Sequence, residues 1–290
     1  MIESKSTRVF YAVNYVLVTL IVLTMLLPLL NIIATSFSSE RAIMSNEVGI
    51  WPVEFTTYTY SQVVNRTPIM RAMRNTVLLT LVGTAICMFM TICGAYALSK
   101  KRLAGRNIFL MMITFTMLVN AGIIPNFLLI KDLGLMNTYW AIWLPGAIST
   151  YNLIVMKTFF ASIPDSLEES AFIDGANDLV IMLKIILPLS LPSIATITLF
   201  YAVGYWNSYF NVMMYVNDSS KKVLQQVLHD LVNASGATDQ LMDSSDQAQN
   251  IATESIKAVS IVIATLPIMC VYPFLQKYFV RGVMIGAVKG

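Results

Sequence analysis

The sequence predicts an all-α integral membrane protein whose 290 residues form one transmembrane domain. Apolar residues make up 57% of the chain and charged residues only 12%, whereas a soluble globular chain carries about 25% charged residues. In addition, six long apolar stretches contain no Asp, Glu, Lys, Arg or His in their interiors. The chain therefore lacks the polar residues of a water-soluble surface and has the segments that a bilayer accepts.

Each of the six apolar stretches approaches the length of about 20 residues that a helix needs to cross a bilayer. They lie over residues 11–34, 75–98, 108–130, 139–156, 193–215 and 258–275. The first is too long for a secretory signal and no A-x-A cleavage pattern follows it, so we interpret it as a retained helix. Pro145-Gly146 interrupts the fourth and Pro267 the sixth. Each break fits a packing kink or a broken helix beside a water-filled path.

Basic residues in short loops predict which side of the membrane is cytoplasmic. The loop between the second and third stretches contains Lys100, Lys101, Arg102 and Arg106, so we expect it to be cytoplasmic. Six spans then place both termini in the cytoplasm. The basic residues near the termini agree with this orientation; they are Lys5, Arg8, Lys277, Arg281 and Lys289. Arg71 and Arg74 oppose it, because they fall on the outer side.

The connection between the fourth and fifth stretches, residues 157–187, is longer than an ordinary loop and has the signals of two short helices. Asp165 or Ser166 can cap the first helix, with a glutamate three residues on in each case, which is a capping-box pattern. Gly175 suits the left-handed position that ends a helix. Asn177 or Asp178 can cap a second helix that continues to residue 185. We expect a helix-turn-helix on the cytoplasmic side.

This predicted helix-turn-helix combines apolar and acidic residues. Five of the sixteen acidic residues fall within residues 165–178, and Phe172 and Ile173 lie beside the glycine turn. An apolar knob with an acidic rim suits a cleft on another protein. The alternative is a solvated acidic elbow without a partner, because charged helical faces are often simply hydrated.

The stretch EESAFIDGANDLVIMLKIILPLSLPSI closely resembles the EAA motif of bacterial ABC importer permeases, and best that of the maltose-type carbohydrate branch. The motif residues are Glu169, Ser170, Ala171, Asp174, Gly175, Ala176, Ile185, Leu187 and Pro188. Ser170 stands where the pattern has alanine, a replacement of one small residue by another. The segment YWNSYFNVMMY, residues 205–215, is similar to the Trp-Asn segment of the family's fifth span. Residues 276–290 look like its cytoplasmic tail.

The resemblance implies a permease subunit in the bacterial cytoplasmic (inner) membrane that imports an oligosaccharide or a polysaccharide fragment. Its implied partners are a second, homologous permease that completes a heterodimer, an ABC ATPase dimer, an extracytoplasmic solute-binding protein, the sugar and membrane lipid. It implies no catalytic site, metal or cofactor on this chain, since ATP and Mg²⁺ bind to the partner ATPase. Nucleic acid is not indicated, because the basic residues form no stripe.

The resemblance also implies site residues. It assigns coupling to the ATPase to Glu168, Glu169, Ala171, Phe172, Asp174, Gly175 and Ala176. It places the C-terminal tail, with Gly286, Lys289 and Gly290, toward the ATPase, although a frayed terminus is an alternative. The residues proposed for the substrate path are Trp206, Asn207 and Tyr209. Trp206 could stack on a sugar ring, or it could simply pack in the protein interior.

The fifth and sixth stretches are joined by residues 216–257, which we expect on the outer side. Asp218, Ser219 or Ser220 can cap a helix there. Its apolar stripe consists of Val223, Leu224, Val227, Leu228, Leu231 and Val232. This helix is expected to lie on the membrane surface or against other outer loops. Residues 236–250 could enter the binding protein, as the corresponding loop does in maltose-type relatives, or form a solvated loop.

Other transport and enzyme classes find less support. An ion-coupled secondary transporter usually has ionisable groups inside the membrane and these spans have none, although a sodium site built from backbone carbonyls stays open. Neither H-E-x-x-H nor G-x-S-x-G is present, and the chain has a single histidine. A Walker A sequence is also absent, so ATP hydrolysis must belong to a partner. Cys87, Cys93 and Cys270 lie in apolar runs and are interpreted as small core residues.

Overall fold

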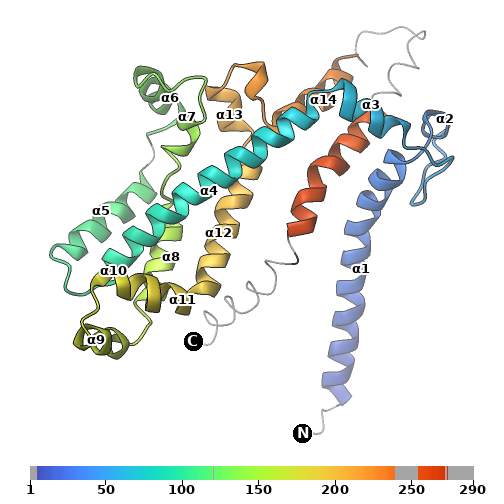
Figure 1. Cartoon of the computed structure of the whole chain (residues 1–290). Coiled ribbons are helices and arrows are strands. Elements are labelled where there is room, and N and C mark those ends of the chain that lie inside the picture. The colour runs from blue at the N-terminus through green and yellow to red at the C-terminus, as the bar shows by residue number, and fades with distance from the viewer. Residues whose placement is uncertain (1–4, 120, 239–253, 272, 274–290) are drawn as a thin grey trace. The chain divides into compact units, whose positions relative to one another are not determined.

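The computed structural model describes residues 5–119, 121–238, 254–271 and 273, and within these residues all regular structure is helical (Figure 1). Contacts divide the chain into two compact units. The first combines Met1–Met70 with Val227–Pro267, and the second contains Arg71–Gln226.

The first unit begins with α1 (Lys5–Ser36), a long apolar helix. Its side chains are exposed throughout residues 10–31, as expected of a helix that is covered by lipid or by another protein. After α1 the chain folds tightly through α2 (Glu40–Met44) and α3 (Tyr58–Arg66). The Phe37 ring stacks on Phe55 and on Tyr60, with centroids 5.4 and 4.9 Å apart.

The second unit holds most of the remaining helices. They are α4 (Ile69–Ser99, whose first two residues belong to the first unit), α5 (Arg106–Leu118), α6 (Ile123–Asp132), α7 (Trp140–Trp143), α8 (Thr150–Phe160), α9 (Asp165–Ile173), α10 (Asp178–Ile181), a π-helical segment (Met182–Ile186), α11 (Leu187–Leu189), α12 (Leu191–Trp206), α13 (Phe210–Tyr215) and a 3-10 helix (Ser219–Lys221). α14 (Leu224–Thr238) follows and passes into the first unit. The core of the second unit includes the fully buried side chains of Leu79, Met156, Ile186 and Ile197.

Among the residues that the structure describes, three helices are long and apolar enough to cross a membrane: Phe10–Ser36, Ile69–Ser99 and Glu254–Val271. They overlap with the first, second and sixth predicted stretches. Two bent helix pairs raise the number to five if each pair is one span, Arg106–Leu118 with Ile123–Asp132 and Asp178–Leu189 with Leu191–Trp206. The fold is thus that of a multi-pass helical membrane protein, and the number six stays a prediction.

The structure departs from the predicted stretches where the backbone bends. Gly122 has a positive φ of 88° at the start of α6, so the third stretch is divided into α5 and α6. The fifth stretch is divided because α12 ends at Trp206, and the Asn207 N–H bonds back to the Val203 carbonyl. The fourth stretch is divided where the sequence predicts an interruption, since residues 144–149, which contain Pro145 and Gly146, separate α7 from α8.

The break between α7 and α8 is held by two tyrosines of α12. The Tyr205 ring packs so closely on Gly83 that a Cβ there would lie 2.7 Å from ring atoms. The Cys87 thiol donates to the Gly146 carbonyl at 3.0 Å and lies 3.3 Å from the Tyr205 hydroxyl. The Tyr201 hydroxyl accepts from the Ser149 N–H at 3.0 Å. These contacts join α4, the break and α12 into one packed region.

The segment that leads into α14 is fixed on the start of α4. The Asn75 side-chain amide donates to the carbonyls of Ser220 and Lys222, both at 2.9 Å. The Leu224 N–H donates to the Thr76 hydroxyl at 2.8 Å. Asp218 caps the short 3-10 helix by accepting from the Ser220 N–H. Most of residues 236–250 lie outside the described residues.

Candidate functional site

The predicted helix-turn-helix between the fourth and fifth stretches is formed by α9 and α10. The prediction for its first cap is wrong: the N-cap is Pro164, whose carbonyl accepts from the Leu167 N–H at 3.2 Å. Asp165 is already the first helical residue, because the proline has an extended backbone that leads directly into the helix. Asp165 and Glu168 lie in the first turn, where negative charge is favoured by the helix dipole.

The turn at Gly175 has the geometry predicted from the sequence. Gly175 has a positive φ of 81°, a region that glycine occupies without steric cost. Its N–H donates to the Phe172 carbonyl at 3.0 Å, and the Ala176 N–H donates to the Ala171 carbonyl at 2.9 Å. These two bonds constitute a Schellman motif, which satisfies the last carbonyls of α9. Asn177 then caps α10 by accepting from the Val180 N–H at 2.9 Å.

The candidate residues on this element face two directions. Ala171 and Ala176 are partly buried and pack against the hydrophobic core, where small side chains permit close approach. Glu169, Asp174 and Gly175 are exposed, and the Ile173 side chain beside them is 87% exposed. Within the described part of the chain, the carboxylates of Glu169 and Asp174 have no recorded ion pair. The outward face therefore offers two carboxylates and one apolar side chain to a partner.

Three acids of the element pair with the three basic residues that follow the end of α4. Lys100 pairs with Glu168, and their side chains are only 12% and 15% exposed. Lys101 pairs with Asp165 at 3.1 Å, and Arg102 pairs with Asp178. None of these three ion pairs was predicted from the sequence, where the basic residues served only to predict topology.

Aromatic side chains reinforce these ion pairs. The Tyr96 hydroxyl donates to the Asp178 carbonyl at 3.1 Å, and the Lys100 Nζ lies 4.3 Å from the centroid of the Tyr96 ring. The Arg102 guanidinium lies 4.8 Å from the centroid of the Phe172 ring. The available sequence signal was a row of three cations and a cluster of acids, both expected on the cytoplasmic side.

The proposed substrate-path residues have different surroundings. Trp206 is buried, and its indole N–H has no hydrogen-bond acceptor among the described residues. Asn207 ends α12, and its side-chain amide donates to the Val203 carbonyl at 3.1 Å. Tyr209 is half-buried, with its hydroxyl 2.9 Å from the Met213 sulfur. Burial of Trp206 favours packing over sugar stacking. Gly286, Lys289 and Gly290 of the predicted tail lie outside the described residues.

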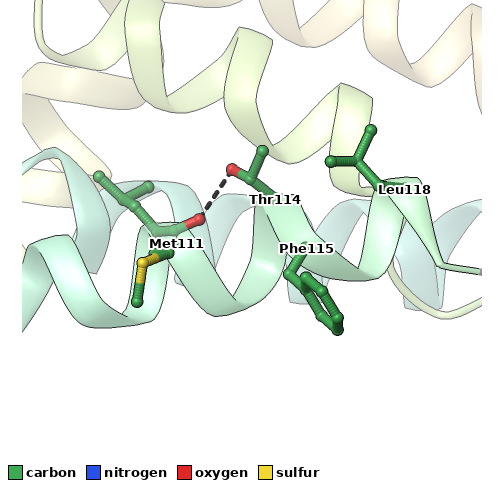
Figure 2. Close-up of a pocket in the computed structure, with 5 residues that line it drawn as sticks. Met111, Thr114, Phe115 and Leu118 are labelled. Atoms are coloured by element: carbon green, nitrogen blue, oxygen red, sulfur yellow. Dashed lines mark hydrogen bonds between the residues drawn. The ribbon is translucent and has the colours of Figure 1, made fainter.

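A shallow hollow of about 370 Å³ lies along α5 (Figure 2). Its lining consists of Leu110, Met111, Thr114, Phe115 and Leu118. The single hydroxyl, on Thr114, already donates to the Leu110 carbonyl at 2.8 Å. A sugar site requires several convergent polar groups, so this hollow fits lipid or an apolar neighbour better than a carbohydrate.

Comparison with known proteins identifies the family. The sequence profile of the "binding-protein-dependent transport system inner membrane component" family matches residues 90–285. The chain is 42% identical over 283 residues to the Bacillus subtilis (strain 168) polygalacturonan/rhamnogalacturonan transport system permease protein YtcP, covering 98% of this chain and 99% of that one. It is 44% identical over 292 residues to protein LplC of the same organism, covering 100% and 98%.

A solved structure is similar over the same extent. It is the crystal structure of a bacterial ABC transporter involved in the import of the acidic polysaccharide alginate. The TM-score is 0.86 at 36% identity, over 96% of this chain and 99% of that chain. These matches confirm the resemblance carried by the EAA-like segment and favour an ABC importer permease over an ion-coupled carrier. The chain therefore belongs to the family of binding-protein-dependent transport system inner membrane components.

Proposed function

We propose that this chain forms half of the translocation path of an ATP-driven importer and is coupled to a separate ATPase through α9, the Gly175 turn and α10. The observation that carries this proposal is the exposed face of Glu169, Ile173, Asp174 and Gly175 on an element that Ala171 and Ala176 anchor to the core. The carboxylates can pair with basic groups of the ATPase, and Ile173 can fill an apolar groove. ATP and Mg²⁺ bind to the partner, and this chain holds no cofactor.

We propose a fragment of a complex polysaccharide as the substrate. Support comes from the relatives, one a permease for polygalacturonan/rhamnogalacturonan and another part of a transporter for alginate. A homologous second permease would complete the path, and an extracytoplasmic binding protein would deliver the sugar.

The contacts inside the second unit support the proposed membrane topology. Ion pairs tie α9 and α10 to one end of α4 (Figure 1). At the other end, Asn75 bonds to residues 220 and 222, and the Asn137 N–H bonds to the Tyr215 carbonyl at 2.8 Å. The chain thus passes between the two ends four times, along α4, α5–α6, α7–α8 and α11–α12. With α1 and Glu254–Val271 as two further spans, we propose six spans and cytoplasmic termini.

The proposal is tested by affinity purification of the chain from mild-detergent membranes, with co-purifying proteins identified by mass spectrometry. We expect a second permease and an ATPase with a Walker motif. Replacing Glu169 with Arg should sharply reduce recovery of the ATPase, because it places a cation against basic groups. Asp132→Arg is the matched control, since Asp132 is an exposed acid at the end of α6. Purification of the chain alone, or full ATPase recovery with Glu169→Arg, would contradict the proposal.

A further inference from the structure

We propose that Lys100 and Arg102 are positioning residues that clamp the coupling element, which consists of α9, the Gly175 turn and α10, to α4. Movement of the element is then transmitted along α4. This inference rests on the proposed function. It assigns a role to two basic residues and to the two acids that pair with them, Glu168 and Asp178. In this assignment Glu168 acts through Lys100, within the chain, and Glu169 and Asp174 remain for the partner.

The clamp holds both helices of the element. Glu168 belongs to α9 and Asp178 to α10, so the two ion pairs lie on either side of the Gly175 turn. Both pairs reach residues directly after Ser99, where α4 ends. A single pair would allow the element to pivot, whereas two pairs on two helices oppose rotation as well as separation.

The three ion pairs are not equivalent. Lys101 and Asp165 are 83% and 70% exposed, so water and salt screen their attraction. Lys100 and Glu168 are largely buried, and the Lys100 ammonium also lies over the Tyr96 ring. Separation of a buried ion pair leaves an uncompensated charge in the protein interior, which strongly destabilises the fold. The Lys100–Glu168 pair therefore resists separation. We therefore place the main constraint at this pair.

The Arg102–Asp178 pair is half-exposed but gains support from its neighbours. The Arg102 guanidinium covers the Phe172 ring of α9 while pairing with Asp178 of α10. The Tyr96 hydroxyl donates to the Asp178 backbone carbonyl at 3.1 Å. One arginine thereby contacts both helices, and one tyrosine of α4 contacts the start of the second.

α4 is suited to carry movement from this clamp. Its final turn is fixed by Arg106, whose side chain donates to the Leu98 carbonyl at 2.8 Å. It continues without interruption for 31 residues, and near its other end Asn75 and Thr76 hold the outer segment at residues 220–224. A displacement of the coupling element would therefore be transmitted to the outer face along α4 as one rigid helix. This route is additional to α8 and α12, the helices that precede and follow the element in the chain.

The test is a charge exchange in the complete importer, reconstituted in vesicles with its partner permease, ATPase and binding protein. The variants are Lys100→Glu, Lys100→Gln, Glu168→Lys and the double variant with Lys100→Glu and Glu168→Lys. Labelled polygalacturonan fragments serve as the transport probe. The readouts are fragments imported per ATP hydrolysed and the amount of ATPase in the purified complex. Lys101→Glu is the matched control, because its ion pair is exposed.

We expect the single variants of the buried pair to retain the ATPase but to import at least about fivefold fewer fragments per ATP, the lower end of usual coupling between sites. The double variant should restore import, and Lys101→Glu should leave it unchanged. Normal import per ATP by both Lys100 variants, or no restoration by the exchange, would overturn the clamp. Glu169→Arg separates the two proposals. If this variant keeps both the ATPase and import, the proposed coupling role of the element fails. If Glu169→Arg loses the ATPase while the Lys100 variants import normally, only the clamp is ruled out.

Discussion

Replacing Gly175 with valine should uncouple ATP hydrolysis from transport through backbone strain alone. A Cβ at this position would meet no heavy atom within 4 Å, so the substitution creates no clash. The cost comes from φ, which is +81°. A left-handed conformation costs an L-residue about 1–2 kcal/mol, which lowers the equilibrium constant for the native turn about 5–30-fold. Asparagine tolerates this conformation better, so Gly175→Asn should have a smaller effect.

A second glycine in the same chain provides the control. Gly134 ends α6 with a φ of +68°, and a Cβ there would also meet nothing within 4 Å. Its N–H bonds to the Lys131 carbonyl, and the Leu135 N–H bonds to the Ile130 carbonyl, which is the same Schellman pattern. Gly134→Val therefore imposes the same backbone cost outside the coupling element.

The assay measures membrane abundance, ATPase recovery and substrate imported per ATP for both valine variants. Gly175→Val should reach the membrane but lose ATPase recovery and import, and Gly134→Val should retain both. Normal import by Gly175→Val would refute the coupling role of the turn. Equal losses in both variants would show that general destabilisation, and not coupling, causes the defect.

Two further predictions concern other parts of the second unit. Gly83→Ala should lower the free energy of unfolding of the purified chain by about 1–3 kcal/mol, because its Cβ would overlap the Tyr205 ring. Gly204→Ala, with open space around its Cβ, should leave the free energy of unfolding unchanged. Equal melting temperatures for the two variants would contradict this packing. Hydrogen bonds from the hydroxyl and N–H of Ser220, followed by the charge of Lys221, hold the pKa of Asp218 below its usual value. The charged carboxylate therefore stabilises this turn above the unfolded pKa and ceases to do so as pH falls through the lowered value. The protection factor of the Ser220 amide, which is the ratio of its intrinsic to its measured exchange rate at each pH, should therefore fall in acid. In Asp218→Asn that fall should be absent, and its persistence would assign it to another group.

Local sequence signals predicted the coupling turn well. Gly175 and Asn177 determine their own backbone geometry and capping bond, so a short segment was sufficient. The error at the start of α9 has a local cause too: Pro164 sets an extended backbone that leads directly into the helix, and the side-chain caps assumed for Asp165 or Ser166 are not needed.

The bends and the clamp depend on contacts between distant residues. Asn120 and Gly122 are the local signal of the bend between α5 and α6, but the mean hydropathy of the stretch stays high across them, so the prediction from hydropathy was one continuous span. The break at Pro145-Gly146 was predicted from the sequence, but not the contacts that hold it, which come from a thiol 59 residues away and from tyrosines of α12. Lys100 and Glu168 are separated by 68 residues, and three cations facing five acids allow many pairings. Only the fold determines which acids turn inward and which remain for a partner.

ATP-driven import is tested most directly by uptake of labelled polygalacturonan fragments into vesicles that contain the purified assembly and a loaded binding protein. We predict uptake that requires ATP and the binding protein and continues when ionophores abolish ion gradients. Uptake without ATP that stops when the ion gradient is abolished would contradict the assignment of this chain to an ATP-driven importer.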